Sequence, residues 1–185
     1  MTYQKVSLDA SADLEPIDAT ILADAELAPS TRVGIVVSQF NKPITHRLLA
    51  AAVTTLRGAG IAADAIDVAW VPGSFELPLA ADRLASTGQY AGVICLGAII
   101  KGETTHDRHI ATAVAVGIEQ ASRARAIPIT FGVLTCETPE QAIARAGGAQ
   151  GNKGVEAAEA TLAMLRLMPT LTQPRNTTHA SHGRV

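Results

Sequence analysis

Aromatic residues and clustered positive charge are both scarce in this chain of 185 residues. Phe, Trp and Tyr together make up 3% of the sequence, the formal net charge is −2, and no run of basic residues occurs. A nucleic-acid-binding protein needs cations for the phosphates, and single strands also need aromatic faces for the bases. The composition therefore argues against nucleic acid as a partner.

Long apolar segments and cysteine are scarce as well. The longest uncharged stretch, residues 84–100, contains Ser, Thr, Gln and Gly and falls short of a membrane span. The first residues contain no apolar signal region, so we expect a cytoplasmic protein without a membrane partner. Cys95 and Cys136 lack metal-ligand spacing, and we expect buried thiols in a reducing compartment. No set of His, Cys and carboxylate side chains has convincing metal spacing, so no metal is expected.

Charged residues are few in relation to hydrophobic ones, at 17% against 48%. A sparsely charged surface favours burial between subunits, and we expect a homo-oligomer. The alternative is that the many alanines simply inflate the hydrophobic fraction.

Apolar strands alternate with helical patterns four times after residue 31. Strands are expected at 32–38, 65–71, 91–98 and 127–135, and helices at 42–59, 73–85, 104–125, 138–146 and 154–167. Continuous apolar strands joined by helical crossovers indicate an α/β fold, a three-layer α/β/α sandwich around a four-stranded parallel sheet.

The two ends of the chain lack such a pattern. Residues 1–31 are expected to form an N-terminal arm, within which residues 6–8 could add an edge strand to a sheet. Residues 32–167 would form the single domain. Residues 168–185 are rich in Pro, Thr, Asn and His, and we expect a disordered tail there.

Polar side chains follow the third strand, where the sequence reads Gly-Ala-Ile-Ile-Lys-Gly-Glu-Thr-Thr-His from Gly97 to His106. A strand that turns through Lys-Gly into a helix brings together free backbone N–H groups, the cation of Lys101, two hydroxyls and an imidazole. These groups can hold an anion beside a proton-transfer residue. In the first turn of a helix the dipole disfavours the imidazolium, and a neutral imidazole can accept a proton. By itself, however, His106 could equally be an exposed surface histidine, and we interpret His109 mainly as a surface or subunit contact.

Two further residues follow other strands at the same edge of the sheet. Phe40 could stack on a flat heterocycle, or its ring could cap the next helix. Glu76 could accept hydrogen bonds from sugar hydroxyls, although a first-turn carboxylate that complements the helix dipole is the simpler interpretation. Arg145 and Lys153, taken alone, are interpreted as solvated charges.

Five motifs in register carry a family resemblance. They are Ser38-Gln-Phe-Asn41, Val71-Pro-Gly-Ser-Phe-Glu-Leu-Pro78, Gly97-Ala-Ile-Ile-Lys-Gly-Glu-Thr-Thr-His106, Phe131-Gly-Val-Leu-Thr135 and Ala146-Gly-Gly-Ala-Gln-Gly-Asn-Lys-Gly154. Together, over about residues 32 to 166, they resemble the 6,7-dimethyl-8-ribityllumazine synthases. The resemblance implies a flavodoxin-like fold and a transferase of riboflavin biosynthesis that acts at the penultimate step. Such an enzyme joins 5-amino-6-(D-ribitylamino)uracil to 3,4-dihydroxy-2-butanone 4-phosphate, with no cofactor or metal.

The resemblance also implies roles for residues at the sheet edge. Phe40 is expected to stack on the pyrimidine ring, and the turn of Ser74, Phe75 and Glu76 is expected to bind the ribityl chain. His106 resembles the general acid/base. The pyrimidine pocket is expected to be lined by the residues after the third strand, Ala98, Ile99 and Ile100.

The resemblance implies further roles, two of which belong to residues of a neighbouring subunit. Glu103 and Thr104 would offer backbone and hydroxyl donors to the phosphate, assisted by Arg145 of the neighbour. Phe131, also from the neighbour, would close the pocket, and Lys153 resembles the family lysine near the ligand.

The chain departs from the family after the histidine, where relatives usually have an aromatic residue and this chain has Asp107-Arg108-His109. We hypothesise a shifted pH optimum as the consequence. The family forms pentamers, and in some members twelve pentamers build an icosahedral shell. The short segment 147–152 lacks the extra residues that resemble pentamer-only members, so we expect the sixty-subunit shell, with riboflavin synthase as a candidate partner.

Two rival interpretations remain open. The archaeal type of riboflavin synthase is a fold relative, but the phosphate-pocket signature argues against it. A non-catalytic lumazine- or flavin-binding paralogue with a shell as its main role is expected to lose His106, Arg145 or the phosphate turn, and this chain retains all three.

Overall fold

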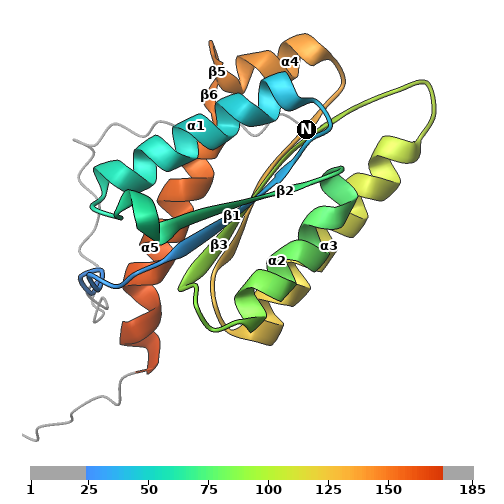
Figure 1. Cartoon of the computed structure of the whole chain (residues 1–185). Coiled ribbons are helices and arrows are strands. Elements are labelled where there is room, and N and C mark those ends of the chain that lie inside the picture. Colours follow the sequence, from blue (N-terminus) through green and yellow to red (C-terminus); the bar gives the residue numbers. More distant parts are fainter. Residues whose placement is uncertain (1–23, 173–185) are drawn as a thin grey trace, which may run out of the picture.

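The computed structural model describes residues 24–172, and a parallel four-stranded sheet forms its centre (Figure 1). The strands are β1 (Val33–Ser38), β2 (Ile66–Val71), β3 (Gly92–Ile100) and β4 (Ile129–Cys136), in the order β2-β1-β3-β4. All three neighbouring pairs are parallel. The expected α/β class with a four-stranded parallel sheet is confirmed.

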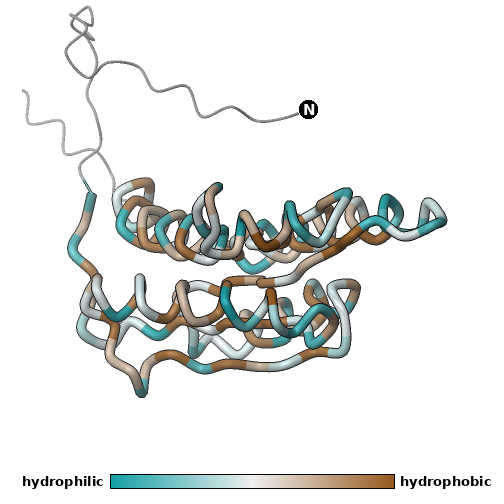
Figure 2. The backbone as a smooth tube through the Cα atoms, turned by 90° about the horizontal axis from the view of Figure 1, so that it is seen from above, coloured by the Kyte–Doolittle hydropathy of each residue, from teal (hydrophilic) through white to brown (hydrophobic). Residues whose placement is uncertain are grey.

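Helices cover both faces of this sheet. On one face lie α1 (Lys42–Gly58) and α5 (Lys153–Thr172), and on the other lie α2 (Leu77–Ser86) and α3 (His106–Arg125) (Figure 1). Strands β1 and β3 are almost wholly buried because apolar helix faces pack against both their sides. Along the helices, hydrophobic and hydrophilic residues alternate, as expected for elements with one buried face (Figure 2).

The remaining elements are short. They are two 3₁₀ turns, η1 (Ala63–Ala65) and η2 (Ser74–Glu76), the helix α4 (Pro139–Ala144), and a hairpin of β5 (Ala146–Gly148) and β6 (Gly151–Asn152). The hairpin was not predicted from the sequence. It depends on Gly147 and Gly151, which adopt φ values of 98° and 80° that residues with a side chain rarely tolerate.

Two element boundaries differ from the prediction in ways that matter. Strand β3 continues to Ile100, so the residues expected in the loop after it belong to the strand itself. Helix α5 continues to Thr172, so residues 168–172 belong to the helix rather than to the expected tail. The hydroxyls of Thr170 and Thr172 donate to the carbonyls of Leu167 and Pro169 at 2.8 and 3.1 Å, which supports this last turn. The rest of the expected tail, and the strand expected at residues 6–8, lie outside the described residues.

Part of the expected N-terminal arm contacts the domain. The Ala25 amide donates to the Arg166 carbonyl at 3.0 Å, and Leu27 packs against the core beneath α1 and α5. Within residues 24–172, no helix combines the length and apolar character needed to cross a membrane.

The loops at the carboxyl ends of the strands are tied to one another. The Gln39 and Phe40 amides, which follow β1, donate to the carbonyls of Val71 and Pro72 at 2.8 and 3.1 Å. Asn41 has a φ of 59°, and its side-chain amide donates a hydrogen bond to the Ala98 carbonyl at 2.9 Å. Three strand ends are thereby fixed in relation to one another, and this is the edge at which parallel sheets bind ligands.

Candidate functional site

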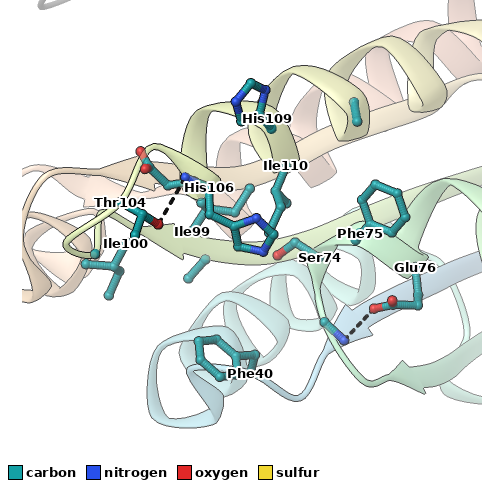
Figure 3. A pocket seen from close by; sticks show the side chains of 15 residues that line it. Phe40, Ser74, Phe75, Glu76, Ile99, Ile100, Thr104, His106, His109 and Ile110 are labelled. Carbon is teal, nitrogen blue, oxygen red and sulfur yellow. Dashed lines mark hydrogen bonds between the residues drawn. The ribbon is translucent and has the colours of Figure 1, made fainter.

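A cavity of about 780 Å³ opens at this edge of the sheet, between the ends of β1, β2 and β3 and the start of α3 (Figure 3). It is large enough for a small organic molecule. Nine residues singled out from the sequence line it: Phe40, Ser74, Phe75, Glu76, Ala98, Ile99, Ile100, Thr104 and His106. The fold thus brings together residues that lie up to 66 positions apart in the chain.

The walls of the cavity are largely apolar. Phe40 and Phe75 expose 71% and 60% of their surface, which is unusual for large aromatic residues. The backbone hydrogen bonds of the loop after β1 fix the position of Phe40, whose ring lies at the side of the cavity opposite α3 (Figure 3). An exposed ring on a backbone held in this way is suited to stacking on a flat ligand.

The η2 turn forms a second wall. Gly73 donates its amide to Oε2 of Glu76 at 2.8 Å, so one carboxylate oxygen stabilises the turn, a contact that neither interpretation of Glu76 included. The other oxygen can still accept a hydrogen bond from a ligand. Ser74 is 7% exposed and lies so close to β3 that a Cβ on Gly97 would be 2.6 Å from its hydroxyl. A glycine in the strand therefore makes room for the turn.

The start of α3 supplies the polar corner of the cavity. The cap residue Thr105 makes no side-chain capping bond, and the His106 amide has only a long contact of 3.4 Å to the Thr104 hydroxyl. The Arg108 amide already donates to the Thr105 carbonyl at 3.1 Å, so the His106 and Asp107 amides are the first-turn donors available to an anion. The imidazole of His106 reaches into the space between Ser74 and Phe40 (Figure 3). An anion bound here would lie beside an imidazole able to transfer protons.

Lys101, the cation expected at this corner of the cavity, does not line it. Nζ of Lys101 forms an ion pair with Oε2 of Glu137 at 2.5 Å, and this contact lowers the pKa of the Glu137 carboxyl. The cavity lining within residues 24–172 includes neither lysine nor arginine. The expectation that Lys101 assists the anion is therefore wrong for a single chain, because Glu137 at the end of β4 is the nearer partner.

The sequence did not single out several residues on the α3 side of the cavity. His109, interpreted as a surface or subunit contact, lines it together with Ile110 and Ala113. With His106 they occupy positions i, i+3, i+4 and i+7, which is one face of a helix, so periodicity counted from His106 would have found them. Asp107 also lines the cavity, and its buried Oδ1 has no hydrogen-bond partner among the described residues.

Four predicted site residues lie apart from this cavity. Glu103 belongs to the turn before α3 but does not line the cavity. Phe131, 37% exposed on β4, lines a separate hollow of about 280 Å³ beside α3. Arg145 and Lys153 lie on either side of the β5–β6 hairpin, and both contact Glu156.

Glu156 was not identified from the sequence, although the i, i+3 spacing from Lys153 was a usable signal. Its carboxylate accepts from Arg145 at 2.9 and 3.2 Å and from Lys153 at 3.0 Å. Burial acts to raise the pKa of this carboxyl, but the hydrogen bond and charge of Lys153 together with Arg145 outweigh burial, and the pKa is lowered. Glu156 is therefore held as a carboxylate between two cations.

Neither thiol is suited to nucleophilic chemistry. Burial raises the pKa of Cys95 to about 12, and it also raises the pKa of Cys136. Within the part of the chain that the structure describes, no three His, Cys, Asp or Glu side chains are grouped so that they could hold a metal ion.

A cavity at the carboxyl edge of a parallel sheet, with an aromatic wall and a helix N-terminus beside an imidazole, defines an α/β protein that binds a small anionic or heterocyclic molecule. A sequence profile of the 6,7-dimethyl-8-ribityllumazine synthases matches residues 30–169. Proteins named 6,7-dimethyl-8-ribityllumazine synthase from Coxiella burnetii strains CbuG_Q212 and RSA 493 / Nine Mile phase I are each 47% identical over 139 residues, which cover 75% of this chain and 92% of the relative. The chain belongs to the 6,7-dimethyl-8-ribityllumazine synthase family.

Proposed function

We propose that this chain condenses 5-amino-6-(D-ribitylamino)uracil with 3,4-dihydroxy-2-butanone 4-phosphate to give 6,7-dimethyl-8-ribityllumazine, water and phosphate. The proposal rests on one observation, made in a chain of this family. A single cavity brings together the exposed ring of Phe40, the polar turn at Ser74–Glu76 and the N-terminus of α3, which can bind an anion. Those features match the heterocycle, the ribityl chain and the phosphate of the two substrates.

The chemistry needs two substrates to be held together while protons move. The amine attacks the carbonyl and forms an imine with loss of one water, phosphate leaves by elimination, and the second amine closes the ring on the remaining carbonyl with loss of a second water. In the proposed arrangement, Phe40 stacks on the pyrimidine and the free oxygen of Glu76 binds the ribityl hydroxyls. The helix amides next to Thr104 receive the phosphate, and His106 transfers protons at the reacting carbon.

The phosphate needs a cation that a single chain does not supply. The cavity lining within residues 24–172 contains no lysine or arginine, and Lys101 is paired with Glu137. We infer that Arg145 and Lys153 of a neighbouring subunit reach this cavity and that Phe131 of that subunit covers it. The separation of these three residues from the cavity of their own chain supports this arrangement.

We propose that the assembly is the pentamer implied by the family resemblance and that pentamers build the sixty-subunit shell. The short connection between β5 and β6 supports this, because it leaves no extra residues that would interfere with further assembly. Light scattering of the purified protein tests the shell, since a single species of pentamer size would refute it. A cytoplasmic location and riboflavin synthase as a partner stay predictions.

The test of the reaction is direct. Purified protein is mixed with the two substrates, and lumazine absorbance and phosphate release are followed together. The proposal predicts equal amounts of both products. A protein that binds the lumazine product but forms none would instead be the non-catalytic, shell-forming paralogue, an interpretation that nothing in the site favours.

A further inference from the structure

A three-residue charge cluster lies away from the cavity, where α4, the β5–β6 hairpin and the start of α5 come together (Figure 1). Glu156, one turn into α5, is its centre. One Glu156 oxygen is 2.9 Å from Nη2 of Arg145, and the other is 3.0 Å from Nζ of Lys153. One carboxylate thus holds two cations side by side, and the cluster keeps a net positive charge.

Hydrogen bonds to two backbone carbonyls also hold the cluster in place. The Lys153 amide donates to the Arg145 carbonyl at 2.9 Å, and Nη1 of Arg145 donates to the Gln150 carbonyl in the hairpin at 2.8 Å. The three charged side chains are between 29% and 42% exposed, so they are partly shielded from water but remain accessible from outside. Arg145 and Lys153 are therefore joined through their backbones, and both side chains contact the carboxylate of Glu156.

The donors left over are numerous. A guanidinium has about five N–H donors and an ammonium about three. Arg145 directs donors to the Gln150 carbonyl and to both Glu156 oxygens, and Lys153 directs one to Glu156. Roughly two donors therefore remain on each cation, which is enough to bind the oxygens of one phosphate group.

We propose that Glu156 is a positioning residue, which holds Arg145 and Lys153 together as a single phosphate-binding unit for the cavity of the neighbouring subunit. The proposal rests on the function proposed above. Without the carboxylate, two like charges would repel each other and two long side chains would each have to be ordered when the phosphate binds. Glu156 offsets the charge repulsion and orders the two side chains before the substrate binds, which lowers the free-energy cost of binding, as preorganisation does in general.

Two other roles for Glu156 make different predictions. A carboxylate that competes with the phosphate for Arg145 would weaken substrate binding, so its removal would lower KM. A carboxylate that only joins α5 to the hairpin would affect thermal stability but not the KM of one substrate over the other.

The experiment measures kcat, both KM values and Tm for Glu156→Ala, Glu156→Gln and a matched control, Asp82→Asn. Asp82 forms a two-pronged ion pair with Arg125 at 2.8 and 2.9 Å between α2 and α3, and neither residue lines the cavity. Glu156→Ala is expected to raise KM for the butanone phosphate about tenfold or more, as when a charge-assisted contact is loosened, with KM for the pyrimidine unchanged. Glu156→Gln, whose amide oxygen can still accept, is expected to show a smaller rise, and Asp82→Asn a lower Tm with unchanged KM values.

Three results would overturn the positioning role. These are an unchanged KM for the phosphate substrate in Glu156→Ala, a lowered one, or an equal rise for both substrates. Inorganic phosphate binding, measured by calorimetry on the assembled wild type and on Glu156→Gln, separates this inference from the proposed reaction. If the wild type is inactive but its Kd for phosphate is lower than that of Glu156→Gln, the proposed reaction alone is refuted. If the wild type is active and the two Kd values are equal, the role of Glu156 is refuted.

Discussion

The substitution Gly97→Ala is expected to disturb the packing of β3 and, through it, the activity of the cavity. A Cβ at this position of β3 would lie 2.6 Å from the Ser74 hydroxyl, 3.1 Å from Leu77 Cδ1 and 3.2 Å from Val133 Cγ1. The hydroxyl must move by about 0.8 Å to reach ordinary contact, or rotate away, and the other two contacts stay tight. Either change displaces the turn that is proposed to bind the ribityl chain.

Two effects of different size are expected. Overpacking costs about 1–3 kcal/mol, which lowers Tm by roughly 2–12 °C for a chain of this length. A misplacement approaching 1 Å can reduce rates by about a hundredfold, so we expect kcat/KM for the pyrimidine substrate to fall by about tenfold to a hundredfold. The KM of the phosphate substrate should change less, because the turn at Ser74 does not contact it in the proposed arrangement.

The assay is steady-state formation of lumazine with each substrate varied in turn, combined with Tm at one protein concentration. Gly34→Ala, in the neighbouring strand β1, is the matched control, since the atoms nearest to its Cβ belong to the side chains of Leu84, at 3.2 Å, and Tyr90, at 3.5 Å, neither of which lines the cavity. The control should keep wild-type kinetics. Wild-type kcat/KM in Gly97→Ala would refute the reasoning that the glycine makes room for a functional turn.

Four further outcomes are expected. His106→Ala should lower kcat by roughly 10²–10⁴ with the oligomer intact, and unaltered turnover would remove the imidazole from the mechanism. Gly154→Ala should cost more than about 3 kcal/mol and prevent assembly, because its Cβ would lie 2.0 Å from a backbone oxygen of α1; a stable variant of normal Tm would contradict this. The hydrogen bond from Arg125 lowers the pKa of Asp82 from 3.8, so the Tm gap between wild type and Asp82→Asn should be full at pH 7 and close as pH falls below that value; a constant gap would exclude the ion pair as its cause. Asp107→Phe should change the pH–rate profile, and an identical profile would end the hypothesis of a shifted optimum.

The sequence predicted the sheet and most of one wall of the cavity because both depend on local patterns. Apolar runs with helical crossovers specify a parallel sheet, and chain order alone assigns Phe40, Glu76 and His106 to one edge of it. The roles expected for Ser74 and Ala98 came from the family motifs, because chain order places a residue at the edge of the sheet without assigning it a ligand.

What the sequence could not predict depends on contacts between distant segments. The partner of Lys101 is Glu137, which lies 36 positions away, and only the register of β3 against β4 brings the two together. The cluster around Glu156 arises in the same way, because the unpredicted hairpin returns the chain so that Arg145 faces α5. Charges that look solvated in the sequence are therefore paired in the fold.

The claim that a neighbouring subunit completes the cavity is tested most directly by mixed oligomers. His106→Ala and Arg145→Ala are each made alone, and then both are co-expressed so that the two chains assemble together. If each site takes its imidazole from one subunit and its guanidinium from the next, the separate variants should be nearly inactive and the mixture should recover roughly a quarter of wild-type activity. A mixture no more active than the average of the separate variants would contradict a shared site.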